Sequence, residues 1–372
     1  MFRVKLFATT THQISTLLRI IAFFWFVAKI WSYKTWVADR TYPVIPLFDY
    51  LNVIPNIIHV GIYVCSLVLL LMILLLPRNK IILLALFIFE FLSCVLDTVR
   101  WQPWEYMYLC FILLFIINFK KPKNVLFLIH VFLVSMYLFG GLHKVNRDFL
   151  SQVWMNMFLM DYLHLNIETI IKYKLFFVGL LIPFFEILFA ILLFFLKKKR
   201  SISVLLIGMH ISILLFLGPL GLAYNSIVWF WNLAMIFILY SLYIVPIAEF
   251  SKKLIFKNVY WIILWYIMPI FSFYGYWYQY FSFNLYSGKG DQIYFCVSNS
   301  AKELQPYFDQ KNYICHNSSQ INLQNWAMAE LKSAPNPEKE INEKIQVFME
   351  KKYKKEIIET TIVSSKNTII KN

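Results

Sequence analysis

The sequence predicts an all-α polytopic membrane bundle of about nine transmembrane helices, followed by a small α/β exterior C-terminal domain. Three observations favour this fold class. The chain is 60% hydrophobic and only 15% charged, so most of its 372 residues cannot form a solvated surface. Apolar runs recur at the roughly 20-residue length that crosses a ~30 Å hydrocarbon core. Beyond Ser287 the composition becomes polar and the apolar runs stop.

The apolar runs should all be helices, because backbone polar groups in lipid must be satisfied within their own segment. Nine spans are expected at about 14–37, 54–76, 80–98, 103–119, 124–144, 173–196, 201–222, 225–247 and 258–281. One connection between them, 145–172, is long. Its apolar residues at helical spacing predict an interfacial helix, with an ordinary linker as the alternative.

Basic residues in alternate loops predict the orientation. The loops rich in Lys and Arg lie at 78–80, 120–123, 197–200 and 252–257. By the positive-inside rule these loops are cytoplasmic, which also accounts for the net charge of +15 without a nucleic-acid partner. We therefore expect an integral protein of the cell or inner membrane with a cytoplasmic amino terminus. Residues 1–283 would form the transmembrane domain and residues 284–372 an extracytoplasmic soluble domain.

The C-terminal segment predicts a mixture of short strands and helices. An Asn336-Pro337 pair predicts a helix start with Asn as the cap, running to about Ile357, and "TTIVSS" after it predicts a strand. Partial disorder of this Lys/Glu-rich stretch is the alternative. Cys296 and Cys315 both lie on the expected exterior side, where a disulfide between them is permitted.

Ionisable residues within the expected spans are candidates for function, because a charge at the bilayer centre costs at least ~2.5–3.5 kcal/mol on insertion scales. They are Lys29, His59, Glu90, Asp97, Glu105, His130, His143, Lys144, Glu186 and His210. Several have an ordinary structural explanation. The stem of Lys29 can extend toward the headgroups, and Asp97 is expected to pair with Arg100.

Two mid-span residues, Glu186 and His210, are harder to explain in this way. Glu186 needs a partner or a proton, and Lys144 is a candidate partner. Asn225 and Asn232 open the span that follows His210. Together these residues predict a polar pocket in the outer half of the bundle, although a path for a solute would use the same groups.

The stretch "YLFGGLHK" places Tyr137, Gly141 and Lys144 on one helix face. The adjacent glycines allow another helix, or a flat ligand, to approach the backbone closely. Desolvation disfavours an ammonium ion, so a neutral lysine here could act as a base. A lysine that ends a span and extends to the headgroups is the alternative.

At this stretch the sequence resembles the HTTM domain, the membrane part of vitamin K-dependent gamma-carboxylases. "YLFGGLHKVNRDFL" is similar to the signature of that domain, and "LDTVRWQPWEYMYLCFILLFIIN" to its upstream Asp, Trp and Tyr-x-Tyr segment. "FFEILFAILLFF" and "LLIGMHISILLFLGPLGLAYNSIVWF" resemble its acidic and His-containing spans. The resemblance covers about residues 12–245.

The resemblance implies a quinone or hydroquinone cofactor and a base at Lys144 that deprotonates it. The expected catalytic group is Lys144 with His143, His210 and Glu186, and the expected cofactor-binding residues are Tyr137, Gly141, Trp104 and Asn225. Trp104 stands where the carboxylases carry a His implicated in carbon dioxide addition, and their large luminal domain is replaced by a short tail. Carboxylation of protein glutamates is therefore not expected.

Three classes of function remain open at this stage. The chain could be a carboxylase-like enzyme or oxidoreductase acting on a quinol or lipid. It could instead be a non-catalytic membrane anchor or assembly partner that binds another protein through its exterior tail. A small-solute transporter is less favoured, because the sequence contains no evident internal repeat of the spans. It also contains no Cys/His metal-ligand spacing and no nucleophile elbow.

Overall fold

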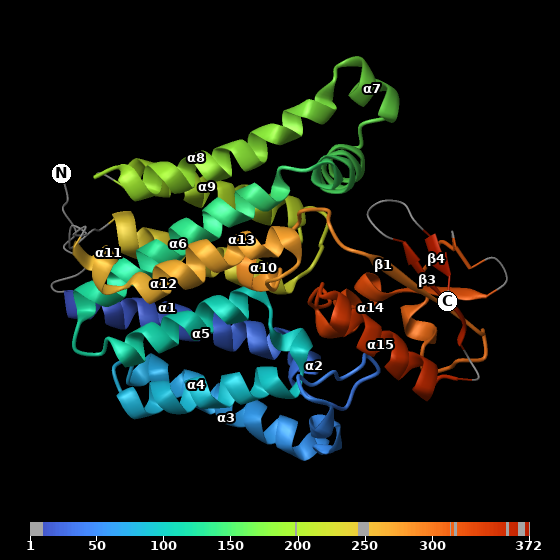
Figure 1. The fold of residues 1–372 in the computed structure, drawn as a ribbon, viewed down its shortest axis with the longest axis horizontal. Coiled ribbons are helices and arrows are strands. Elements are labelled where there is room, and N and C mark those ends of the chain that lie inside the picture. Colours follow the sequence, from blue (N-terminus) through green and yellow to red (C-terminus); the bar gives the residue numbers. More distant parts are fainter. Residues whose placement is uncertain are drawn as a thin grey trace.

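A computed structural model describes residues 10–371, except 198, 245–252, 313, 316–317, 355–356 and 364–368. The basic residues Lys198 and Lys252 and the first residues of the chain, on which part of the orientation rests, lie outside the described residues. The described chain is mostly helical, as predicted. Its long helices lie side by side, and a small sheet with its own helices is attached at one end (Figure 1). We call this end of the bundle the domain-side end.

Six of the described helical segments are long and apolar enough to cross a membrane. They are α1 (Thr10–Trp31), α3 (Asn56–Leu75), α6 (Pro122–Lys144), Leu175–Phe195 with α8 (Leu181–Phe195), α9 (Arg200–Leu217), and Ile227–Ile244 with α10 (Ile227–Leu239). The other three expected spans also contain helices, which are shorter. They hold α4 (Lys80–Leu96), α5 (Pro103–Ile117), and the short helices α12 (Val259–Ile262) and α13 (Met268–Phe271). Two further short helices are α2 (Tyr33–Trp36) and α11 (Lys253–Lys257).

Helix α6 is almost entirely buried, and its glycines bring it against α8. A Cβ atom added to Gly141 would lie 2.7 Å from the Ile187 side chain and 3.1 Å from the carbonyl oxygen of Pro183. Only glycine permits this separation between the two backbones. The pair of glycines noted in the sequence is therefore used for helix packing at Gly141.

The long connection contains the helix Phe149–Tyr162, which we call the cross helix, and then α7 (Ile167–Lys172). In Figure 1 the cross helix is the green helix seen end-on below α7, so it runs across the direction of the bundle helices. Trp154 packs against Gly179, where any Cβ atom would overlap its ring, and donates a hydrogen bond to the Leu175 carbonyl at 2.9 Å. The helix expected in this connection is confirmed, and the linker alternative is wrong.

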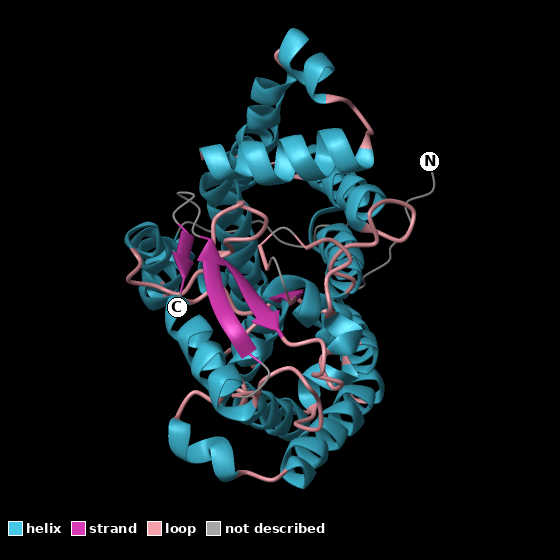
Figure 2. Cartoon of the chain, turned by 90° about the vertical axis from the view of Figure 1, so that its right-hand side faces the viewer, coloured by secondary structure: helices cyan, strands magenta, loops and turns pink. Residues whose placement is uncertain are grey.

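The C-terminal domain has a four-stranded antiparallel sheet in the order β2-β1-β3-β4 (Figure 2). Its strands are β1 (Gln292–Val297), β2 (Ser319–Asn322), β3 (Ile357–Val363) and β4 (Ile369–Lys371), and its helices are α14 (Leu323–Leu331) and α15 (Lys339–Lys352). Cys296 and Cys315 form a disulfide. The Lys/Glu-rich stretch is helical rather than disordered, because Ile341, Ile345 and Met349 bury one side of α15.

The bounds predicted for this last helix are wrong at both ends. Glu338, not Asn336, precedes the first turn. Asn336 Oδ1 accepts a hydrogen bond from the Glu338 amide at 3.1 Å, and the Asn336 side-chain amide donates to the Thr98 carbonyl in the bundle at 3.1 Å. The helix ends at Lys352, since Ile357 already belongs to β3.

The C-terminal domain is docked firmly on the loops at the domain-side end. The Glu330 carboxylate accepts hydrogen bonds from the backbone amides of Thr41 and Tyr42, each at 2.7 Å. Thr35 donates to the Leu331 carbonyl at 2.9 Å. Tyr42 also packs its ring against Trp326 inside the core of the domain. The loops at the domain-side end therefore contribute Tyr42, Ile45 and Val99 to the core of the domain, which is separate from the core of the bundle.

Replacing Gly141 with Ala should separate α6 from α8 and lower the free energy of unfolding by about 1–3 kcal/mol, the usual effect of overpacking. Gly61→Ala is the matched control, since a Cβ atom there meets nothing within 4 Å. Thermal unfolding of both variants in detergent checks this. Equal midpoints for the two variants would contradict the packing role of Gly141.

Candidate functional site

A cavity of about 390 Å³ lies among α6, α8, α9, α10 and the cross helix. Its walls are largely aromatic and aliphatic, and a few polar side chains from different helices converge on it. Four of the residues expected to form a site line this cavity: Tyr137, Lys144, Glu186 and His210. A mostly apolar hollow of this volume with a few convergent polar groups is typical of a site for a small ligand.

Lys144 and Glu186 form an ion pair on the wall of the cavity, as the sequence suggested they could. The Lys144 ammonium lies 2.7 Å from Glu186 Oε2 and also donates to the Gly140 carbonyl at 3.0 Å. The two side chains are 14% and 12% exposed. The ion pairs Lys29–Glu90 and Arg40–Asp97, by contrast, have no exposure. A ligand in the cavity can therefore reach the Lys144–Glu186 pair.

A second set of polar side chains at the cavity comes from α6, α9 and α10. His210 Nδ1 donates to Asn232 Oδ1 at 2.7 Å, an assignment fixed because the Asn232 amide nitrogen donates to the Val228 carbonyl. The neutral imidazole then accepts at Nε2, so Tyr137 donates its hydroxyl proton there at 2.8 Å. The Tyr137 oxygen keeps lone pairs that can accept a hydrogen bond from a ligand.

The segment after the last expected span supplies another wall of the cavity through Phe283, Leu285 and Tyr286. Asn225 does not line the cavity, but its amide donates to the Tyr286 hydroxyl oxygen at 3.1 Å. Burial raises the pKa of the Tyr286 phenol, so this hydroxyl stays protonated at neutral pH. Sequence reasoning missed Tyr286, because no spacing links it to residues of the earlier spans.

Besides Asn225, three of the expected site residues do not line the cavity. Neighbouring residues of a helix point about 100° apart, so His143 points away from the direction of Lys144. It stacks on Phe273 at 4.3 Å and is hydrogen-bonded to Ser272. Gly141 faces α8. Trp104 packs against Trp36 of α2 and against Tyr108 of its own helix, α5. The structure does not bring these three together with Lys144 in the cavity.

The polar residues near Trp104 form a separate buried group. Lys29 is fully buried, pairs with Glu90 at 2.8 Å, and lies 3.1 Å from the centre of the Trp36 ring. The expectation that its stem reaches the headgroups is therefore wrong. Glu105 accepts a hydrogen bond from Trp25 Nε1 at 2.7 Å.

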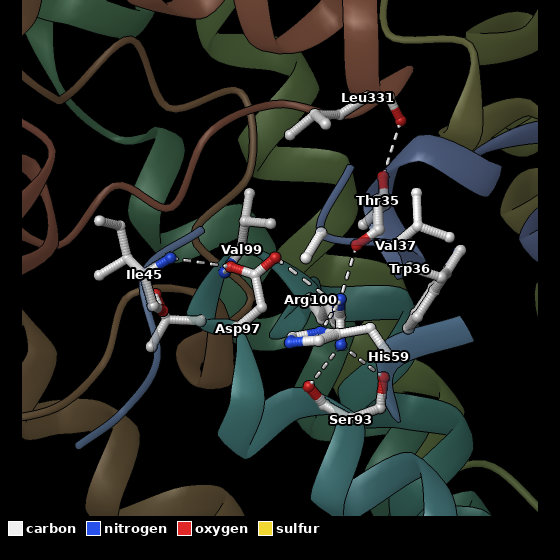
Figure 3. Close-up of polar contacts among 12 residues, drawn as sticks. Thr35, Trp36, Val37, Ile45, His59, Ser93, Asp97, Val99, Arg100 and Leu331 are labelled. Carbon is white, nitrogen blue, oxygen red and sulfur yellow. Dashed lines mark hydrogen bonds and ion pairs between the residues drawn. The ribbon is translucent and has the colours of Figure 1, made fainter. Parts of the chain in front are cut away.

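Asp97 and Arg100 pair as expected, at 3.6 Å (Figure 3). Figure 3 shows the Arg100 guanidinium beside His59, and it bonds to the Ser93 carbonyl at 3.0 Å and the Thr35 carbonyl at 2.9 Å. Each charged member of this group has at least one protein partner, which is typical of a structural group, although Glu90 Oε1 and Glu105 Oε1 have none. Among the described residues, no cluster of three or more His, Cys, Asp or Glu side chains could hold a metal ion.

Removing one partner of the accessible ion pair should cost more than removing both. Glu186→Leu leaves the Lys144 ammonium without its carboxylate, whereas the double variant Lys144→Met/Glu186→Leu leaves no unpaired charge. We expect the double variant to unfold at a higher temperature than Glu186→Leu, as measured by thermal unfolding in detergent. A lower midpoint for the double variant, with additive losses, would contradict the pairing.

The comparison with known proteins adds no family to this description. No protein-family model, no curated protein and no solved structure matches the chain. The chemistry of the cavity is therefore inferred from its own side chains.

Proposed function

We propose that this chain is a polytopic membrane protein of HTTM type that binds a quinol or a comparable lipid in the cavity and uses Lys144 as a base. One observation carries the proposal. Lys144 and Glu186 form an ion pair that is open to an apolar, aromatic-walled cavity. An amphiphile with an acidic hydroxyl group is the ligand that such a cavity suits, since its ring and tail match the walls and its hydroxyl matches the pair.

We further propose that all nine expected helical segments cross the membrane, with the amino terminus in the cytoplasm and the C-terminal domain outside. The contacts of the domain support this arrangement. They come from Thr35, Thr41, Thr98 and Ile227, all at the ends of the helices away from the basic loops. The basic loops then face the opposite side from the domain, as the positive-inside rule requires.

The Lys144–Glu186 pair offers a balanced route for one proton. In this proposal the Glu186 carboxylate, 2.7 Å from the Lys144 ammonium, accepts one of its protons and leaves a neutral amine. The Lys144 amine then accepts the proton of a bound hydroxyl group and becomes an ammonium ion beside the oxyanion. A bound hydroquinone would supply this acidic hydroxyl.

The other cavity residues have binding roles in this proposal. Trp154, Phe158 and Trp231 supply aromatic walls against which an aromatic headgroup would pack. Tyr137, whose proton is held by His210, presents an acceptor for a second hydroxyl group. His210 and Asn232 orient Tyr137 and need not exchange protons with the ligand.

Mass spectrometry of the quinones and lipids that co-purify with the protein tests the proposal. We expect a quinone to be enriched on the wild type and lost from Lys144→Ala, because the polar anchor of the ligand is removed. Lys172→Ala, an exposed lysine on α7, is the control and should retain the ligand. Equal quinone content in the wild type and in both variants would overturn the proposal.

A further inference from the structure

The segment that joins the bundle to the C-terminal domain, residues 283–288, lies against the cavity. We call it the junction segment. Phe283, Leu285 and Tyr286 all line the cavity, so half of this short segment forms part of one wall. No helix contributes this wall. The ligand site is therefore closed by a stretch of irregular chain that leads directly into β1 of the domain.

The backbone of the junction segment is held in a conformation that it would not adopt alone. Phe283 and Tyr286 have φ angles of 57° and 51°, in the left-handed region that is unfavourable for residues with a Cβ atom. Gly288 has a φ of 71°, and a Cβ atom there would overlap the Asp148 carbonyl. Such conformations persist only where the surrounding structure determines them, and they cluster at binding sites.

The neighbours that hold the segment come from both sides of the cavity. The Asn146 amide, just before the cross helix, donates to the Ser287 carbonyl at 3.1 Å. Asn225, just before α10, donates to the Tyr286 hydroxyl at 3.1 Å and itself has a φ of 47°. The domain that follows the segment is itself docked on the bundle through Glu330 and Asn336. These contacts hold the Tyr286 side chain, which lines the cavity.

The hydroxyl of Tyr286 is suited to contact a ligand. Its oxygen already accepts a hydrogen bond from Asn225, which leaves its proton available to donate. Lys144 and Glu186 lie on α6 and α8, whereas Tyr286 belongs to the wall supplied by the junction segment. A ligand with two oxygen groups could therefore be held by Lys144 and Tyr286 together.

We propose that Tyr286 is a ligand-binding residue and that the C-terminal domain serves to hold the junction segment closed over the ligand. This inference rests on the proposed function, because it assigns a further contact to the same ligand. It also gives the domain a role that does not require a protein partner. The domain would complete the site, and the bundle alone would leave one side of the ligand uncovered.

Titration of the full-length protein with ubiquinone-2, followed by quenching of tryptophan fluorescence, tests this inference. Trp154 and Trp231 line the cavity and should report the bound quinone. We expect Tyr286→Phe to bind roughly threefold to tenfold more weakly than the wild type, as for the loss of one hydrogen bond. Tyr266→Phe is the matched control, because it loses a bond to the Val131 carbonyl at 3.0 Å away from the cavity.

The possible results separate the two proposals. Weaker binding by Tyr286→Phe and by Gly288→Ala, with unchanged binding by Tyr266→Phe and an unchanged unfolding temperature of Tyr286→Phe, would support the role of the junction segment. Weaker binding by Lys144→Ala with wild-type binding by Tyr286→Phe would overturn this inference and leave the proposed function intact. No quenching of the wild-type protein, or equal quenching in every variant, would overturn both.

Discussion

The buried carboxylate of Asp97 is the interaction on which the domain-side end of the molecule depends. It pairs with Arg40 at 2.6 Å and with Arg100 at 3.6 Å, and none of the three side chains is exposed. Removing one partner from such a buried group would leave an uncompensated charge, which is among the most costly events in a folded protein. The loop after α2 and the turn between α4 and α5 can therefore take only the arrangement that keeps these charges together.

The arrangement of these charges also affects how the C-terminal domain docks on the bundle. The two guanidinium groups use their remaining donors on backbone carbonyls, with Arg40 bound to the Thr35 and Pro43 carbonyls and Arg100 to the Ser93 carbonyl. The loops so fixed present Thr41 and Tyr42 to the C-terminal domain. The docked domain in turn fixes the junction segment, so the wall of the cavity is linked to Asp97 by contacts throughout.

Much of the fold could be predicted from the sequence, because the signals involved are local. Long apolar runs predict helices in a bundle, and the three-residue spacing of Asp97 and Arg100 predicts their pairing. Six segments have the length needed to span a membrane, while the expected nine spans remain a prediction. The pairing of Lys144 with Glu186, 42 residues apart, was one of several options and was settled only by the packing of α6 on α8.

The parts of the site that the sequence did not predict depend on contacts between distant segments. Lys29 pairs with Glu90, which is 61 residues away in the sequence. The first span alone could therefore not predict that Lys29 is buried. His143 is next to Lys144 in the chain, yet the helix turns it toward Phe273. Tyr286 lines the cavity because the docked domain holds its segment there. The residues next to it in the sequence do not indicate this position.

The place of the junction segment in the chain has a consequence for biogenesis. Residues 283–286 are made after every helix of the bundle, and chains generally fold from the amino-terminal side as they emerge. The helices that carry Lys144, Glu186 and His210 can thus assemble while one wall of the cavity does not yet exist. A ligand that enters during this interval would meet an open cleft. Docking of the finished domain would then enclose the ligand.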